Sequence, residues 1–91
     1  MGVDKKDITE LYKVLLTIDS VEKMQEFFND LCTYKEIEQM AQRLMSAKLL
    51  IGGATYEEVI KATDISSATL SRVSKCVKYS NGYKKVLQSE N

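Results

Sequence analysis

The chain has 91 residues, a hydrophobic fraction of 44% and no net charge, with 13 Lys and Arg against 13 Asp and Glu. This length predicts a single domain, and because so small a domain is marginally stable alone, the high apolar content favours a partner subunit. The sequence has no His, no phosphate-binding loop and no paired carboxylates beyond capping positions. An enzyme is therefore the weakest hypothesis, and we expect neither catalytic residues nor a metal site.

Charge is distributed unevenly along the chain. Residues 1–60 carry seven Lys and Arg and eleven Asp and Glu, a net charge of −4, whereas residues 61–91 carry six and two, a net charge of +4. A basic C-terminal third is expected of a protein that binds a polyanion, although chance clustering on a solvated surface would give the same pattern.

The cysteines and the N-terminus bear on the compartment. Cys32 and Cys76 form neither a CxxC nor a metal-binding pattern, and the start MGVDKKD lacks the apolar core of a signal peptide. The longest apolar run, around 49–51, is far too short to span a bilayer. We therefore expect a cytoplasmic protein with reduced thiols and no membrane partner.

Capping boxes predict where four helices begin. In such a box a capping side chain is followed three positions later by Glu, and each side chain accepts a hydrogen bond from the other residue's backbone N–H. Each candidate box precedes an apolar segment of helical periodicity. The pairs are Asp7 with Glu10, Asp19 with Glu22, Thr33 with Glu36, and Thr55 with Glu58.

Apolar periodicity and the scarcity of Pro and Gly predict an all-α fold with five to six helices. Gly52 and Gly53 end the longest helix, and the SNG sequence at 80–82 is a turn signal. In chain order the helices cover about 8–17, 21–31, 34–51, 56–62, 67–79 and 83–87.

Three parts follow within the single domain 1–91. We expect a helical dimerisation core at 1–53, a helix-turn-helix at 55–77, and a turn with a short helix at 78–91. The first three helices carry more apolar side chains than a compact monomer of this length buries easily. The alternative is a monomer with a tight three-helix core and loose ends.

The segment 55–77 has the apolar spacing of a DNA-binding helix-turn-helix. Two short helices must be held at a fixed angle by a small core, which Val59, Ile65, Leu70 and Val73 supply. The tight turn needs a residue that tolerates a positive φ, and Asp64 occupies that position.

Short polar side chains gather at the start of the second of these helices, which Ser66 is suited to cap. Recognition helices dock their N-terminal residues onto base edges, where Ser, Thr and Ala allow close approach and Arg binds guanine or phosphate. A helix pair packed only for stability, or one that docks a partner protein, is the alternative. The predicted DNA-binding residues are Ser67, Ala68, Thr69, Ser71, Arg72, Lys75 and Lys78, with Lys84 and Lys85 as further phosphate contacts.

Three stretches resemble the Trp repressor family, and more closely the small Trp-repressor-like proteins of bacteria. They are LCTYKEIEQMAQRL at 31–44, LLIGGATYEEV at 49–59 and SSATLSRVSK at 66–75. The resemblance implies a sequence-specific transcriptional regulator, expected to be a repressor, built as an intertwined homodimer. Two-fold symmetry then implies a palindromic operator in double-stranded DNA, with half-sites about one turn apart.

The resemblance also implies a place for a small-molecule corepressor. In tryptophan-binding members it lies between the core and the reading head, and Thr33, Arg43, Arg72 and Cys76 fall on that site. Tryptophan is disfavoured, because Val73 replaces a Gly against which the indole packs and Cys76 replaces a Ser that helps to hold the amino group. Another effector, or none, remains open.

An alternative role for Arg43 and a further departure from the family pattern both concern charge. Arg43 could instead be a surface cation paired with Glu36 or Glu38. On the first helix of the motif, polar and basic positions of the family become Tyr56, Glu57 and Ile60, so we expect a different target sequence.

Overall fold

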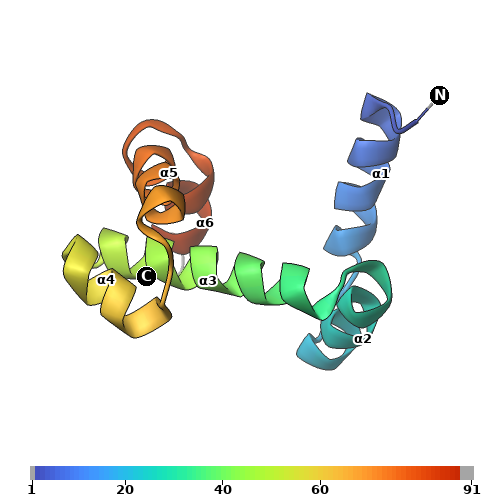
Figure 1. The fold of residues 1–91 in the computed structure, drawn as a ribbon. Helices are drawn as coiled ribbons and strands as arrows, with labels where there is room; N and C mark the ends of the chain where they lie inside the picture. The colour runs from blue at the N-terminus through green and yellow to red at the C-terminus, as the bar shows by residue number, and fades with distance from the viewer. Residues whose placement is uncertain (1, 89–91) are drawn as a thin grey trace. The chain divides into compact units, whose positions relative to one another are not determined.

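The computed structural model describes residues 2–88, and within that range it contains helices and no strand. The predicted all-α fold is confirmed, and the longest helix, 34–51, and the second helix of the motif, 67–79, have the predicted bounds (Figure 1). The chain divides between Tyr34 and Lys35 into two compact units. The helices are α1 (Lys5–Leu16), α2 (Val21–Leu31), α3 (Tyr34–Ile51), α4 (Tyr56–Thr63), α5 (Ser67–Tyr79) and α6 (Gly82–Gln88).

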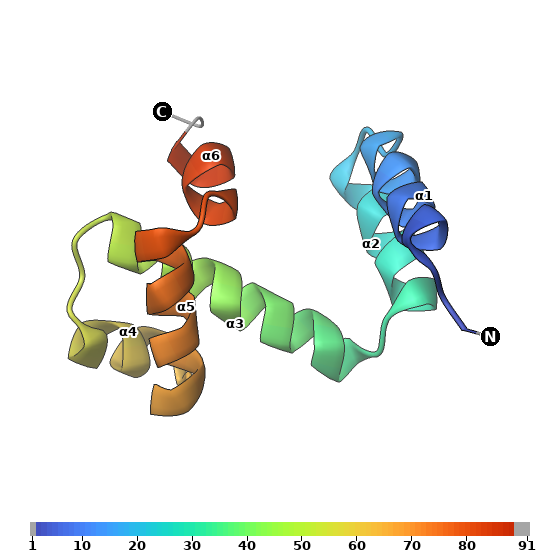
Figure 2. The same cartoon turned by 90° about the horizontal axis from the view of Figure 1, so that it is seen from above.

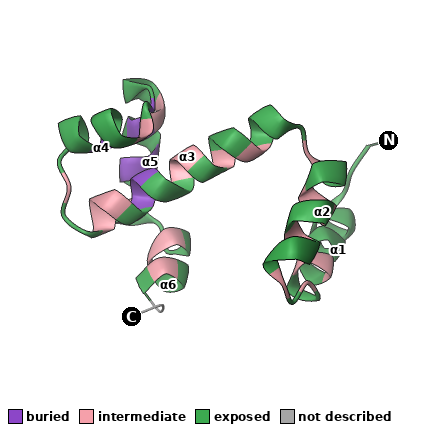
Figure 3. Ribbon diagram, turned by 90° about the horizontal axis from the view of Figure 1, so that it is seen from below, coloured by how far each residue is buried: buried purple, intermediate pink, exposed green. Residues whose placement is uncertain are grey.

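The N-terminal unit exposes many of its large apolar side chains and buries none of them fully. Neither α1 nor α2 contains a buried residue, although both helices have an apolar face (Figure 3). Val14, Leu15, Met24, Phe27 and Phe28 are only half-buried, so the hydrophobic gain is partial and the unit has no fully buried core within one chain. The exposed large apolar residues are Val3, Ile8, Leu11, Tyr12, Leu16, Val21, Leu31 and Tyr34.

The predicted cap of the first helix is wrong by one turn. Asp4, not Asp7, is the N-cap, and its Oδ1 accepts hydrogen bonds from the backbone N–H groups of Lys6 (2.8 Å) and Asp7 (3.1 Å). The Asp7 carboxylate accepts in return from the Asp4 N–H at 3.2 Å. The pair Asp7 with Glu10 was expected because Glu is the usual partner, but the shorter Asp7 closes the same box.

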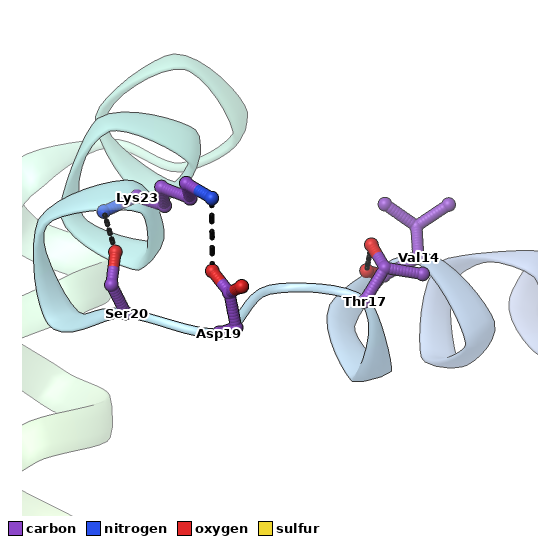
Figure 4. A network of polar contacts seen from close by, with 5 residues as sticks. All are labelled: Val14, Thr17, Asp19, Ser20 and Lys23. Carbon is purple, nitrogen blue, oxygen red and sulfur yellow. Dashed lines mark hydrogen bonds and ion pairs between the residues drawn. The ribbon is translucent and has the colours of Figure 1, made fainter.

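The predicted cap of the second helix is also wrong. Ser20 is the N-cap, and its Oγ accepts from the Lys23 N–H at 3.1 Å (Figure 4). Asp19 lies one residue too early to cap and instead forms an ion pair with Lys23 Nζ at 2.9 Å. The box of Asp19 with Glu22 does not form. An exposed pair of this kind contributes little to stability, so the cap fixes the helix start.

The C-terminal unit has a small closed core. Ala47, Val59, Ile65, Leu70 and Val73 are buried, which confirms the apolar spacing predicted for the helix-turn-helix and adds Ala47 from α3. Figures 1 and 2 show α4, α5 and α6 around the C-terminal part of α3. The motif is therefore anchored on the long helix by buried apolar surface.

Glycine ends α3, as predicted. Gly53 has φ +98°, a conformation that side chains rarely adopt. Its N–H donates to the Leu50 carbonyl at 3.1 Å, and the Ala54 N–H donates to the Leu49 carbonyl at 3.0 Å. This pair of bonds satisfies the carbonyls at the helix end and turns the chain into α4.

Candidate DNA-binding surface and adjacent pocket

A reciprocal capping box fixes the start of α4, as predicted. Thr55 Oγ1 accepts from the Glu58 N–H at 3.2 Å, and Glu58 Oε1 accepts from the Thr55 N–H at 2.9 Å. The hydrogen bond from the Thr55 backbone, helped by the Thr55 side chain, lowers the pKa of Glu58 below its ordinary value of 4.5. The charged form of Glu58 is therefore the one that supports the helix start.

The turn of the motif has the predicted geometry. Asp64 has φ 58° and ψ 24°, in the left-handed region, and its N–H donates to the Ile60 carbonyl at 2.8 Å. Asp tolerates this region better than most residues. The next residue, Ile65, is buried and begins the passage to α5.

Ser66 caps α5, as predicted, and engages one of the expected DNA contacts. Its Oγ accepts from the Thr69 N–H at 3.2 Å and donates to Thr69 Oγ1 at 2.9 Å. Thr69 is half-buried, and its own hydroxyl hydrogen is left to donate to a base or a phosphate.

The other predicted DNA-binding residues share the exposed face of α5. Leu70, Val73 and Ser74 are buried on the opposite face. With 3.6 residues per turn, the exposed positions form one continuous strip that runs down the helix. They are Ser67, Ala68, Ser71, Arg72, Lys75 and Lys78.

Among the residues that the structure describes, the cations of this strip are shown with no carboxylate partner. Within residues 2–88, the ion pair between Lys23 and Asp19 involves none of Arg72, Lys75 and Lys78. Three unpaired positive charges on one helix face suit the phosphates of a polyanion. Lys84 lies apart from the strip, because its Nζ donates to the Lys78 carbonyl at 3.4 Å, at the C-terminal end of α5.

A pocket of about 220 Å³ lies beside α5. It brings together three of the four residues predicted to bind an effector and adds two others. Thr33, the fourth, belongs to the N-terminal unit, and its role stays a prediction. The lining residues are Arg43 of α3, Arg72, Val73 and Cys76 of α5, and Tyr83 of α6.

The two guanidinium groups that line the pocket favour an anionic ligand. Within the described residues the ion pair between Lys23 and Asp19 involves neither Arg43 nor Arg72, and the alternative pairing of Arg43 with Glu36 or Glu38 stays a prediction. Arginine recognises carboxylates and phosphates through parallel N–H donors. Tyr83 could not be predicted as a lining residue, because no local pattern shows how α6 packs on α5.

Other kinds of site find no support in the described range. Across residues 2–88 no three His, Cys, Asp or Glu side chains are grouped so that they could hold a metal ion. None of the helices described there combines the length and apolar character that a membrane crossing requires. Both cysteines are free thiols and half-buried.

The chain is similar to known proteins over nearly its whole length. The family described as Trp repressor protein matches residues 6–91. The uncharacterized protein YerC of Bacillus subtilis (strain 168) is 40% identical over 84 residues, which cover 89% of this chain and 81% of YerC.

Two solved structures share the fold. A Staphylococcus aureus protein proposed to be a Trp repressor has a TM-score of 0.91 and 34% identity, and the match covers 97% of this chain and 89% of that one. A TrpR-like protein from Eubacterium eligens ATCC 27750 has a TM-score of 0.89 and 31% identity, with coverages of 94% and 90%. The matched family is regulatory rather than enzymatic, and family and fold together indicate a DNA-binding regulator with a helix-turn-helix.

Proposed function

Because the chain belongs to the Trp repressor family, we propose that it is a sequence-specific repressor of transcription that acts in the cytoplasm. One observation carries the proposal. The exposed strip of α5 combines short hydroxyl side chains with unpaired cations, and its opposite face is fixed by the buried Leu70 and Val73. A rigid helix with such a strip fits the major groove of DNA.

The predicted DNA-binding residues of α5 divide into a reading part and a holding part. Ser67, Thr69 and Ser71 lie in the first two turns of α5, where a recognition helix meets base edges. Lys75 and Lys78 lie further along and would contact phosphates, which position the protein without specifying sequence. Arg72 lies between the two parts and could read guanine.

A homodimer would complete the N-terminal unit. Leu16 is 85% exposed and Val21 is 82% exposed, and no residue of α1 or α2 is buried. Contiguous exposed apolar surface marks an interaction site, and a second copy with the same unmet faces is the simplest partner. Two copies would place two α5 helices on a palindromic operator with half-sites about 34 Å apart.

The division of labour along the chain follows. We propose that 1–53 forms the dimerisation core, 55–77 the helix-turn-helix, and 78–91 the C-terminal turn and short helix. Ala47 of α3 is buried together with the core of the motif, so α3 would serve both of the first two parts.

The test is selection from a random duplex library at near-physiological salt, followed by sequencing of the retained DNA. We expect an enriched palindrome, and we expect Arg72→Ala to change its sequence. The selection is repeated with a small-molecule extract of cells, since an effector could be needed. A folded dimer that enriches no sequence under either condition would contradict sequence-specific binding.

A small anion is the second candidate ligand. The pocket of about 220 Å³ has two arginines, and Val73 lines it where an indole would need space. We propose that it takes a carboxylate or phosphate compound without a large ring, held by Arg43 and Arg72. Calorimetry with succinate, inorganic phosphate and tryptophan tests this, with Arg43→Gln as the variant and Lys35→Gln as the matched control. Tryptophan binding by the unaltered protein would contradict the proposal.

Protein docking is the alternative use of the motif. Tyr56 is 43% exposed and Ile60 is 37% exposed, four positions apart on α4. Residues at this spacing share one helix face, and apolar side chains there fit a partner protein better than a phosphate backbone. Failure of the DNA selection would favour this reading.

A further inference from the structure

A polar cluster joins the long helix to the turn of the motif. Gln42 Nε2 of α3 donates to the backbone carbonyl of Thr63, the last residue of α4, at 3.0 Å. Ser46 Oγ, one turn further along α3 and fully buried, donates to the Gln42 carbonyl at 2.8 Å and lies 3.3 Å from Thr63 Oγ1. We call Gln42, Ser46 and Thr63 the turn brace.

The Thr63 hydroxyl holds both sides of the turn. It donates to the Val59 carbonyl of α4 at 2.8 Å and accepts from the Ile65 N–H at 3.3 Å. Ile65 is 2% exposed, so this N–H has little access to water. Buried backbone donors are costly when unpaired, so the hydroxyl favours the observed path of the chain through Asp64.

We propose that Thr63 is a positioning residue for DNA recognition, which sets the direction in which α5 leaves the turn. The proposal rests on the proposed function. In the proposed function Thr63 does not contact DNA, and it affects recognition by fixing the position of Ile65 and the start of α5. Gln42 and Ser46 of α3 contact Thr63. The orientation of α5 is therefore fixed relative to the long helix α3 as well as to α4.

Such positioning affects specific binding more than non-specific binding. The reading part of α5 has short side chains, Ser67, Thr69 and Ser71, which must approach base edges within hydrogen-bond distance. The lysines act on phosphates through longer-range, sequence-independent attraction, which tolerates a small tilt of α5. A loosened turn therefore lowers the ratio of specific to non-specific affinity.

The principal test is Thr63→Val, which keeps the shape of the side chain and removes the hydroxyl. Affinities for the selected operator and for a scrambled duplex are measured at one salt concentration. We expect the ratio of operator affinity to scrambled-duplex affinity to fall at least about tenfold. This fall is small compared with the total discrimination of about 10³ to 10⁷ that is typical of specific DNA-binding proteins. Thr63→Ser should restore most of it. The matched control is Thr9→Val on the exposed α1. In the unaltered protein the Thr9 hydroxyl donates to the Lys5 carbonyl, four residues earlier, at 2.9 Å, which is the same kind of bond that Thr63 makes to Val59.

A second variant acts on the turn without altering the motif. Gln42→Met keeps the length of the side chain and removes the donor to Thr63, and Gln39→Met on the exposed part of α3 is its control. We expect a smaller fall in the same ratio and faster hydrogen exchange at the Ile65 amide. This variant decides the matter if Thr63→Val does not fold.

The outcomes separate the two proposals. Equal loss of specific and non-specific affinity, as a lower folded fraction would give, overturns the positioning role and leaves DNA recognition intact. An unchanged ratio does the same. If the unaltered protein distinguishes no operator from a scrambled duplex, the proposed function fails, and the positioning role fails with it.

Discussion

The two units of this chain solve the problem of burying apolar surface in different ways. The C-terminal unit closes five apolar side chains into a core within one chain, whereas α1 and α2 of the N-terminal unit bury none (Figure 3). Both units have capped, amphipathic helices. The difference therefore lies not in helix formation but in whether each apolar face has a partner in the same chain.

This contrast fits the task that we propose for each unit, DNA reading for the C-terminal unit and dimerisation for the N-terminal unit. A reading head must keep its shape when it meets DNA, and a core formed from nearby segments provides that independence. A dimerisation unit instead gains its stability from association, so its apolar faces stay exposed in one chain. The two units should then respond differently to the loss of an apolar side chain.

The largest effect is expected inside the C-terminal core. Leu70 is fully buried, and Leu70→Ala should lower the free energy of unfolding by about 2–5 kcal/mol, because it leaves a cavity among closely packed neighbours. Urea denaturation at several protein concentrations measures this. The control is Ile60→Ala, at a side chain of α4 that is 37% exposed. A loss below about 1 kcal/mol for Leu70→Ala would contradict a closed core.

The next effect should appear only through association. Replacing Leu16 and Val21 together by Ser should raise the dimer dissociation constant at least about tenfold, because burying each apolar side chain is worth about 1.5–3 kcal/mol. Sedimentation velocity over a dilution series measures the constant. Ile60→Ser, at an exposed position of α4, should leave it unchanged. If the unaltered protein is a monomer at every concentration, the dimer is excluded.

A smaller effect should distinguish the charges of the two units. Lys75→Gln should weaken DNA binding about threefold to tenfold and reduce the salt dependence by about one phosphate contact, with the sequence preference kept. Lys13→Gln, on α1 of the N-terminal unit, removes the same charge away from α5 and should change neither quantity. Fluorescence titrations at several salt concentrations compare the two. Equal slopes for both variants would remove Lys75 from the DNA surface.

The sequence predicted best what depends on neighbours along the chain. The core of the motif, the left-handed Asp64 and the Ser66 cap follow from spacing and from the conformational range of single residues, and all three are confirmed. Helix starts in the N-terminal unit were predicted less well. Asp19 and Ser20 are adjacent and both can accept hydrogen bonds as an N-cap. Which of them caps the helix depends on the residue at which the helix begins.

Contacts between segments far apart in the chain could not be predicted from the sequence. The hydrogen bond from Gln42 to Thr63 joins residues 21 positions apart, and nothing in either local pattern pairs them. Tyr83 reaches the pocket only because α6 folds back beside α5. Both features depend on the tertiary arrangement of the helices. Arg43 and Arg72 could be predicted as effector-binding residues only from the family resemblance, because their spacing in the sequence does not indicate a shared pocket.

The smallest effect concerns the capping box of α4, the counterpart of the Asp4 box that begins α1. Hydrogen bonds from Thr55 lower the pKa of Glu58 below its ordinary value of 4.5, so the folded state holds the charged form more strongly than the unfolded state does. The contribution of Glu58 to stability is therefore present above pH 4.5 and is lost as the pH falls through the lowered value. Glu58→Gln should flatten the decline of the urea midpoint between pH 5 and about pH 3.

The control for this prediction is Glu57→Gln, the adjacent carboxylate in the first turn of α4. It shares the favourable interaction of an acid with a helix N-terminus but makes no reciprocal bond to the Thr55 backbone. If both variants change the pH dependence equally, the general field of the helix is responsible and not the box. A change confined to Glu58→Gln would show that a hydrogen bond made within one chain fixes the start of α4, independently of the second copy that we propose for the N-terminal unit.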